Sequence, residues 1–152
     1  MNLESLELEK IDYKKVEHLE FLKLLMNSTS IDYLWDISDG NLSVNLNENS
    51  FIVLNDSKQK IGYLNISDIT EAIYGKTVSI YYAIEENYRG KGYGKKLVKE
   101  ISHYLFNEKG MDCIVAQVAR DNIPSQVILS RNGYRKVFED EDNTKFLQTK
   151  KR

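Results

Sequence analysis

The chain has 152 residues, the size of one domain, and we expect a single domain over residues 1–152 with a sizeable core. Its composition, 41% hydrophobic and 29% charged, is that of a soluble globular protein, and its formal net charge of −2 argues against general nucleic-acid binding. The single Cys113 forbids an internal disulfide, no stretch approaches the ~18 apolar residues of a membrane-spanning helix, and the acidic N-terminus is unlike a signal peptide, so we expect a cytoplasmic protein.

The first third of the chain predicts one strand and two helices. Residues 3–10 alternate in part between polar and apolar side chains, which indicates a strand. Residues 13–26 have helical spacing, with Asp12 as the candidate N-cap, and residues 31–37 predict a short second helix. The apolar face expected on the first helix consists of Val16, Leu19, Leu22 and Met26.

The middle of the chain predicts a three-stranded meander. A loop rich in Asn and Ser, residues 41–50, leads into two strands at 51–54 and 60–69, joined by a turn at 55–58. A third strand follows at 78–84.

The last third predicts two helices and three strands. A helix over 95–108 ends near Gly110, and the apolar run 113–118 indicates a buried strand. A second helix begins after Asn122 and ends at Asn132-Gly133, and two final strands cover 134–138 and 144–147. The full order, β-α-α-β-β-β-α-β-α-β-β, predicts an α/β fold with a mixed sheet.

A glycine-rich loop, residues 89–94, stands between a predicted strand and a predicted helix. It reads Arg89-Gly90-Lys91-Gly92-Tyr93-Gly94 and is followed by Lys95-Lys96. Glycines allow close backbone approach to a ligand, and a helix N-terminus offers unpaired N–H groups to an anion. Lysines at a helix N-terminus oppose the helix dipole, which favours a phosphate ligand over simple solvation. The loop therefore predicts a phosphate or pyrophosphate site.

Two common phosphate-binding motifs do not fit this loop. The dinucleotide fingerprint G-x-G-x-x-G fails because position 95 is Lys, and the Walker motif fails because Lys96 stands where Ser or Thr is required. A nucleotide-phosphate enzyme that uses the loop in another way is still an alternative.

Two ordered blocks of sequence resemble the GNAT acetyltransferases. Arg89-x-x-Gly92-x-Gly94 resembles the coenzyme A signature [Q/R]-x-x-G-x-[G/A] of that family. Asn122-Ile123-Pro124-Ser125 followed by Gly133-Tyr134 resembles its later cofactor segment. The Asn-x-x-Ser pattern is most similar to the subgroup of ribosomal-protein N-terminal acetyltransferases. The resemblance covers residues 78–138.

The resemblance implies a single-domain, mixed and mostly antiparallel sheet flanked by helices, with strands four and five splayed around acetyl-CoA. It implies that pantetheine pairs with the backbone of Tyr82, Ala83 and Ile84, near an amide that holds the oxyanion. The pyrophosphate would bind the loop, with Asn122 and Ser125 on the pantetheine arm. The complete set of residues implied for the pyrophosphate is Arg89, Gly90, Lys91, Gly92, Tyr93, Gly94 and Lys95.

The reaction implied is direct attack of a neutral amine on the thioester, which needs a base to remove a proton. Glu85 is our first candidate; Glu86, Asp68 and Glu71 are alternatives, and each of these carboxylates also fits a solvated surface position. The tyrosine that protonates the leaving thiolate in many members is replaced by Leu129, so Ser125 is the candidate for this role.

The acceptor implied is an amine on a small molecule or a peptide, and Tyr33 and Trp35 are candidates for its pocket or for plain aromatic packing. A coenzyme A-binding module without catalysis is the alternative function. We expect no metal, because His18 and His103 lack a second ligand one turn away. We expect no nucleic-acid or membrane partner. A homodimer formed through the late strands is a further possibility.

Overall fold

The computed structural model describes residues 1–12, 14–28, 49–69 and 75–151. The helix expected at 31–37, most of the loop expected at 41–50, and Tyr33, Trp35 and Glu71 lie outside these residues. The described elements, with η2 a short 3-10 helix, are β1 (Glu7–Lys10), α1 (Val16–Ser28), β2 (Ser50–Leu54), β3 (Lys60–Ile69), β4 (Thr77–Ile84), η2 (Glu86–Tyr88), α2 (Tyr93–Asn107), β5 (Cys113–Ala119), α3 (Ile123–Arg131), β6 (Arg135–Glu139) and β7 (Asn143–Thr149).

The strands form a mixed sheet in the order β1-β2-β3-β4-β5-β7-β6. β4 and β5 are parallel, whereas β1 with β2, β2 with β3, β5 with β7 and β6 with β7 are antiparallel. The parallel ladder runs from Thr77↔Cys113 to Ile80↔Ala116, and both strands continue beyond its last pair. The expected mixed, mostly antiparallel α/β sheet is confirmed.

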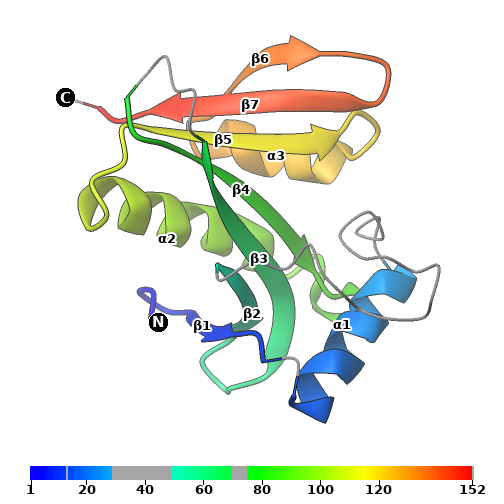
Figure 1. Ribbon diagram of the computed structural model, residues 1–152. Coiled ribbons are helices and arrows are strands. Elements are labelled where there is room, and N and C mark those ends of the chain that lie inside the picture. Colours follow the sequence, from blue (N-terminus) through cyan, green and yellow to red (C-terminus); the bar gives the residue numbers. More distant parts are fainter. Residues whose placement is uncertain (13, 29–48, 70–74, 152) are drawn as a thin grey trace. The chain divides into compact units, whose positions relative to one another are not determined.

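The chain divides into two compact units. The first consists of Met1–Asn65 with Tyr82–Tyr93, and the second of Ile66–Tyr81 with Gly94–Arg152. In the first unit, the predicted 55–58 turn joins β2 to β3, and β1 pairs with the outer edge of β2 (Figure 1). Its buried apolar side chains come from β1, α1, β2 and β3 and include Leu8, Leu22, Leu25, Ile52, Val53, Ile61, Tyr63 and Leu64.

The second unit places β7 between β5 and β6 and contains most of α2 and all of α3 (Figure 1). The apolar face of α2 is buried, except that Tyr104 is only half-buried. At roughly 1.5–3 kcal/mol for each fully buried large aliphatic side chain, this face is a main source of the unit's stability. The buried side chains of that face are Leu97, Val98, Ile101 and Leu105.

The apolar face predicted for α1 is wrong in part. Val16 is 67% exposed, whereas Phe21 and Leu25 are buried beside Leu22. Apolar residues occupy so many positions between 16 and 26 that helical spacing allows more than one face. The helix also starts later than predicted, at Val16, so Asp12 is not its N-cap; the Asp12 carboxylate instead accepts from the Lys14 N–H at 2.9 Å.

A buried histidine lies on the face that α1 turns inward. His18 is 1% exposed; its Nδ1 accepts from the Asp12 N–H at 3.0 Å, and its Nε2 lies 2.6 Å from Glu9 Oε1. Both ring nitrogens thus have partners, as buried polar groups require. Because Nδ1 accepts a backbone hydrogen bond, the proton of the neutral ring is on Nε2. His18 is therefore a structural link between β1 and α1.

Two further expectations need correction. The first strand begins only at Glu7. The run 113–118 was expected to be fully buried, but in β5 only Cys113, Ile114 and Ala116 are buried, and Gln117 is exposed. Among the described residues, no helix has the length and apolar character needed to cross a membrane.

Candidate active site

The glycine-rich loop lies where the sequence predicts it, between the end of β4 and the first turn of α2. The chain leaves β4 at Ile84, forms η2, and enters α2 at Tyr93. The side chains of the first turn of α2, all of which are described, include Lys95 and Lys96 and no acidic residue. Tyr82–Tyr93 belong to the first unit, and Gly94 and Lys95 belong to the second. A helix N-terminus with lysines in its first turn is a favourable place for an anion to bind.

Two glycines give the loop its backbone conformation. Gly90 has a φ of 75° and Gly92 a φ of 84°, in the left-handed region that non-glycine residues rarely adopt. A Cβ added at either glycine would meet no heavy atom of the described residues within 4 Å, neighbours in the chain aside. The space beside both glycines is therefore open, and a side chain would intrude on any group bound there. Gly94, the third glycine of the motif, is buried in α2.

The cations of the loop differ in their partners. Arg89 Nε donates to the Ile84 carbonyl oxygen at 2.9 Å, so the guanidinium reaches back to the end of β4. Lys91 Nζ lies 5.6 Å from the centroid of the Tyr88 ring, within the range of a cation–π contact. Both side chains are on exposed residues and add positive charge to the loop.

Glu85, the carboxylate proposed as the base, is 3% exposed and directly follows β4. Its Oε2 accepts from the Asn87 N–H at 3.0 Å, which makes it the N-cap of η2, and its Oε1 accepts from the Asn87 side-chain amide at 3.3 Å. Its own N–H donates to the Ile61 carbonyl oxygen at 2.8 Å. The burial separates Glu85 from the alternatives Glu86 and Asp68, which are exposed.

Sequence reasoning missed Gly62, which lies in β3 opposite the proposed pantetheine strand. A Cβ at Gly62 would stand 2.6 Å from the Ala83 carbonyl oxygen and 3.1 Å from Ile84 Cδ1. Only glycine lets the two strands approach this closely. An isolated glycine inside a strand pattern signals close backbone approach, so the sequence did contain a usable signal.

The second predicted cofactor segment, at the start of α3, is in the second unit. Asn122 caps this helix, because its Oδ1 accepts from the Ser125 N–H at 3.3 Å, as predicted. Ser125 is buried, on the same face as Leu129. Lys95 lies in the same unit, where its carbonyl oxygen accepts from the Asn132 side-chain amide at 3.4 Å.

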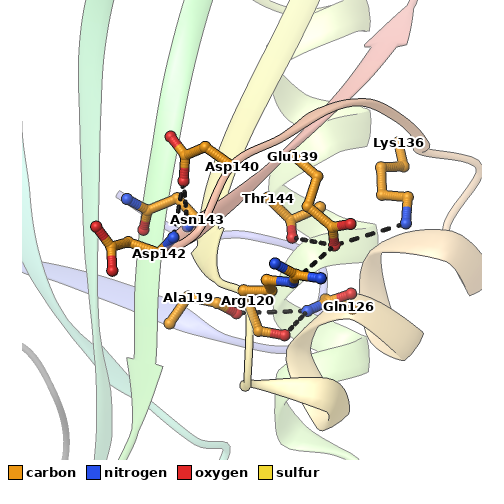
Figure 2. Close-up of polar contacts among 9 residues, drawn as sticks. All are labelled: Ala119, Arg120, Gln126, Lys136, Glu139, Asp140, Asp142, Asn143 and Thr144. Carbon is orange, nitrogen blue, oxygen red and sulfur yellow. Dashed lines mark hydrogen bonds and ion pairs between the residues drawn. The ribbon is translucent and has the colours of Figure 1, made fainter.

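The connection that carries Asn122 is held by side chains from α3, β6 and β7 (Figure 2). Gln126 Nε2 donates to the carbonyl oxygens of Ala119 and Arg120 at 3.4 and 2.8 Å. Arg120 Nε lies 3.8 Å from the Glu139 carboxylate, which also accepts from Thr144 Oγ1 at 3.2 Å. These contacts restrain the end of β5 and so the position from which α3 begins.

The position at which the resemblance to the GNAT acetyltransferases implies a thiolate-protonating tyrosine holds Leu129, which is fully buried. The nearby Tyr134 is buried too, and its hydroxyl lies 2.7 Å from Ser102 Oγ in the same unit. Leu129 therefore belongs to the buried core of the second unit, and its side chain has no proton to transfer.

The family model for the acetyltransferase (GNAT) domain matches residues 12–135, more than half of the chain. The chain therefore belongs to the GNAT acetyltransferase family, whose general activity is acetyl transfer from acetyl-CoA. A comparison with the curated proteins finds no significant match.

Solved structures of acetyltransferases share the fold at low sequence identity. The N-acetyltransferase PseH from Campylobacter jejuni, in complex with acetyl coenzyme A, is similar with a TM-score of 0.70 at 18% identity, over 96% of this chain and 99% of that one. A GNAT-family acetyltransferase from Bacillus anthracis has a TM-score of 0.69 at 16% identity, over 98% and 97%. The ribosomal-protein-S5-alanine acetyltransferase from Vibrio fischeri has a TM-score of 0.59 at 22% identity; the similarity covers 66% of this chain and only 60% of that protein.

Proposed function

We propose that this protein is a cytoplasmic, single-domain N-acetyltransferase that moves an acetyl group from acetyl-CoA to a primary amine by direct attack on the thioester. The observation that carries the proposal is the glycine-rich loop, where two left-handed glycines with open space beside them precede a helix that starts with lysines. This is the arrangement that a pyrophosphate needs, because backbone N–H groups bind its oxygens and cations balance its charge.

In the proposed complex, the pyrophosphate binds the backbone of the loop, from Arg89 to Gly94, with Lys91 and Lys95 nearby. Pantetheine pairs with Tyr82, Ala83 and Ile84. The parallel ladder between β4 and β5 has its last pair at Ile80↔Ala116, before these three residues, which supports this assignment. An amide near Ile84 would hold the thioester oxygen as negative charge develops on it.

Glu85 is the proposed base. Its place directly after β4, at the end of the strand proposed to bind pantetheine, supports this role. Asn122 and Ser125 are proposed to contact the pantetheine arm, and Ser125 to assist the leaving thiolate. A thiol with an ordinary pKa of about 8.5 leaves readily enough that one hydroxyl would suffice.

The acceptor is proposed to be a peptide or small-molecule amine. The ribosomal-protein acetyltransferase among the similar structures and the Asn-x-x-Ser pattern at Asn122 support the peptide amine. A panel of N-terminal peptides, polyamines and amino acids, followed by the release of free thiol, separates these acceptors.

Features of β6 argue both for and against a homodimer formed through the late strands. β6 ends the strand order, and its Val137 and Phe138 are 46% and 57% exposed, which favours a partner on this edge. Arg135, Lys136 and the register shift between Lys136 and Phe138 oppose strand pairing. Light scattering on the purified protein measures which effect dominates.

The central experiment is calorimetry with acetyl-CoA and with coenzyme A, followed by the amine panel. An acetyltransferase binds both and releases thiol with at least one amine. Binding without turnover across the panel would favour the alternative, a coenzyme A-binding module, which the replacement of the family tyrosine by Leu129 supports. No uptake of either compound would exclude both functions.

A further inference from the structure

We propose that Asn55, in the turn between β2 and β3, is a positioning residue for the glycine-rich loop. It acts through Tyr93, which lies near the end of the loop. The inference rests on the proposed function of this loop as the coenzyme A site. All of the residues that it uses belong to the first unit.

Both the oxygen and the nitrogen of the Asn55 side-chain amide form hydrogen bonds. Its Oδ1 accepts from the N–H groups of Ser57 and Gln59 at 3.0 and 2.9 Å. Its Nδ2 donates to Gln59 Oε1 at 2.8 Å and to the Tyr93 hydroxyl at 3.3 Å. Asn55 is 3% exposed. Three of these bonds form the turn itself, and the fourth reaches 38 residues along the chain.

Tyr93 in turn contacts the residue that precedes the loop. The Tyr88 and Tyr93 rings meet edge to face, with centroids 6.2 Å apart and planes at 66°. Tyr88 and Tyr93 thus bracket the exposed residues between them, and Lys91 Nζ lies over the Tyr88 ring. A buried amide, two rings in edge-to-face contact and a lysine form one continuous set of contacts from the turn to the loop.

This set of contacts has a physical consequence for binding. The exposed middle of the loop contains two glycines, which have the greatest conformational freedom of any residue. A loop that is ordered before the ligand arrives loses less entropy on binding. Asn55 is expected to supply part of this order, and its loss should weaken coenzyme A binding without any lost contact to the ligand.

Two variants and their combination test the inference. Tyr93→Phe removes one hydroxyl and keeps the ring and the turn, whereas Asn55→Ala removes the donor. Each is expected to raise the Kd for coenzyme A about five-fold, the factor that one hydrogen bond contributes. The double variant should also be about five-fold weaker than the parent, since both changes break the same link. Ser57→Ala, in the same turn, is the matched control and should bind as the parent does.

Backbone NMR relaxation in the ligand-free protein gives a readout that needs no ligand. The order parameters of the Lys91 and Gly92 N–H groups should fall in both single variants and not in Ser57→Ala. If Asn55→Ala does not fold, Tyr93→Phe has the turn intact and carries the relaxation test alone.

The other outcomes overturn the inference. If Tyr93→Phe weakens binding and Asn55→Ala does not, the hydroxyl contacts the ligand itself. If the two effects multiply to about 25-fold, the residues act separately. Unchanged order parameters and unchanged affinity in both variants would leave Asn55 as a turn residue only, with the proposed function intact. A parent protein that takes up no coenzyme A would instead remove the proposed function and, with it, this inference.

Discussion

Glu85 accepts hydrogen bonds from Asn87 at both carboxylate oxygens, from the backbone N–H at 3.0 Å and from the side-chain amide at 3.3 Å. One residue thus caps η2 and stands at the end of the proposed thioester strand. The capping bonds fix the carboxylate in place. The two roles, cap and base, respond differently to substitution.

Glu85→Gln separates these roles. The glutamine oxygen still accepts from the Asn87 N–H, so the midpoint of thermal unfolding should shift by only a few degrees. A base that cannot take a proton should lower kcat by at least about 100-fold. Steady-state kinetics with the best acceptor measure this. A kcat within a few-fold of the parent would reduce Glu85 to a cap, and Asn87→Ala, which removes one of the capping bonds, is the control.

Gly92→Ala tests the phosphate site against a matched glycine. Gly110 also has a positive φ, 67°, and open space around an added Cβ, but it follows the far end of α2. Alanine at either position should cost about 1–2 kcal/mol of unfolding free energy from backbone strain. Only Gly92→Ala should weaken coenzyme A binding, by at least about ten-fold. Equal affinities in the two variants would contradict the assignment.

Asn122 is expected to combine a cap with a ligand contact. Asn122→Ala should lower the unfolding free energy by about 1 kcal/mol, because the Ser125 N–H loses its acceptor. Asn122→Asp restores the acceptor and the stability but has no amide to donate to pantetheine. The affinity for coenzyme A should therefore fall in both variants, while stability falls in one. Full affinity in Asn122→Asp would leave Asn122 as a cap alone.

Asp140 is expected to contribute to stability at neutral pH and not in acid. Hydrogen bonds from the backbone N–H groups of Asn143 and Asp142 lower the pKa of its carboxyl group (Figure 2). A folded-state pKa below the unfolded value, about 3.9 for a free aspartate, means that the stabilisation is present above pH ~4 and is lost as the pH falls through the folded pKa. Asp140→Asn should therefore be less stable than the parent at pH 7 and equal to it in strong acid.

Denaturation at several pH values measures the difference for Asp140. Because the side chain is exposed, a small effect is expected. Asp142→Asn removes the same charge from the same turn, and it controls for net charge. A stability difference that does not vary with pH would count against the assignment to Asp140.

Cys113 is expected to be unreactive in the folded protein. Burial raises the pKa of its thiol, with the hydrogen bond to Thr77 acting in the opposite direction and the charge of Asp112 adding to the rise. The thiolate is the reactive form, and the residue is fully buried, so modification by a thiol reagent at pH 8 should be at least about 100-fold slower than in denaturant. Rapid stoichiometric labelling of the native protein would contradict this.

The raised pKa of the Cys113 thiol also makes the stability of the protein depend on pH. The unfolded thiol ionises near its ordinary pKa of about 8.5 while the folded thiol does not, so its contribution is complete below that pH and is lost as the pH rises through the folded value. Unfolding measured from pH 7 to 10 should show this loss in the parent and not in Cys113→Ala.

The strands and helices near the glycine-rich loop were predictable because their signals are local. Gly90 and Gly92 are glycines where the backbone needs a positive φ, and Asn122 stands where a helix needs a cap. The face of α1 was not predictable, since Val16 and Leu25 have the same apolar character and only packing decides which is buried. The exposure of Val137 and Phe138 follows from the place of β6 at the end of the strand order, which no periodicity reveals.

The sequence by itself determined the family, the order of the elements that the structure describes and the loop that is proposed to bind the cofactor, because turn chemistry and capping depend on neighbouring residues. Only the tertiary structure decided that Glu85 is buried, that Gly62 lies against Ala83, and that Asn55 reaches Tyr93. Those relationships join residues far apart in the chain, and they arise from the pairing of strands and the packing of turns. A single sequence does not specify such distances, since the same residue types are compatible with many partners until the fold brings particular ones together.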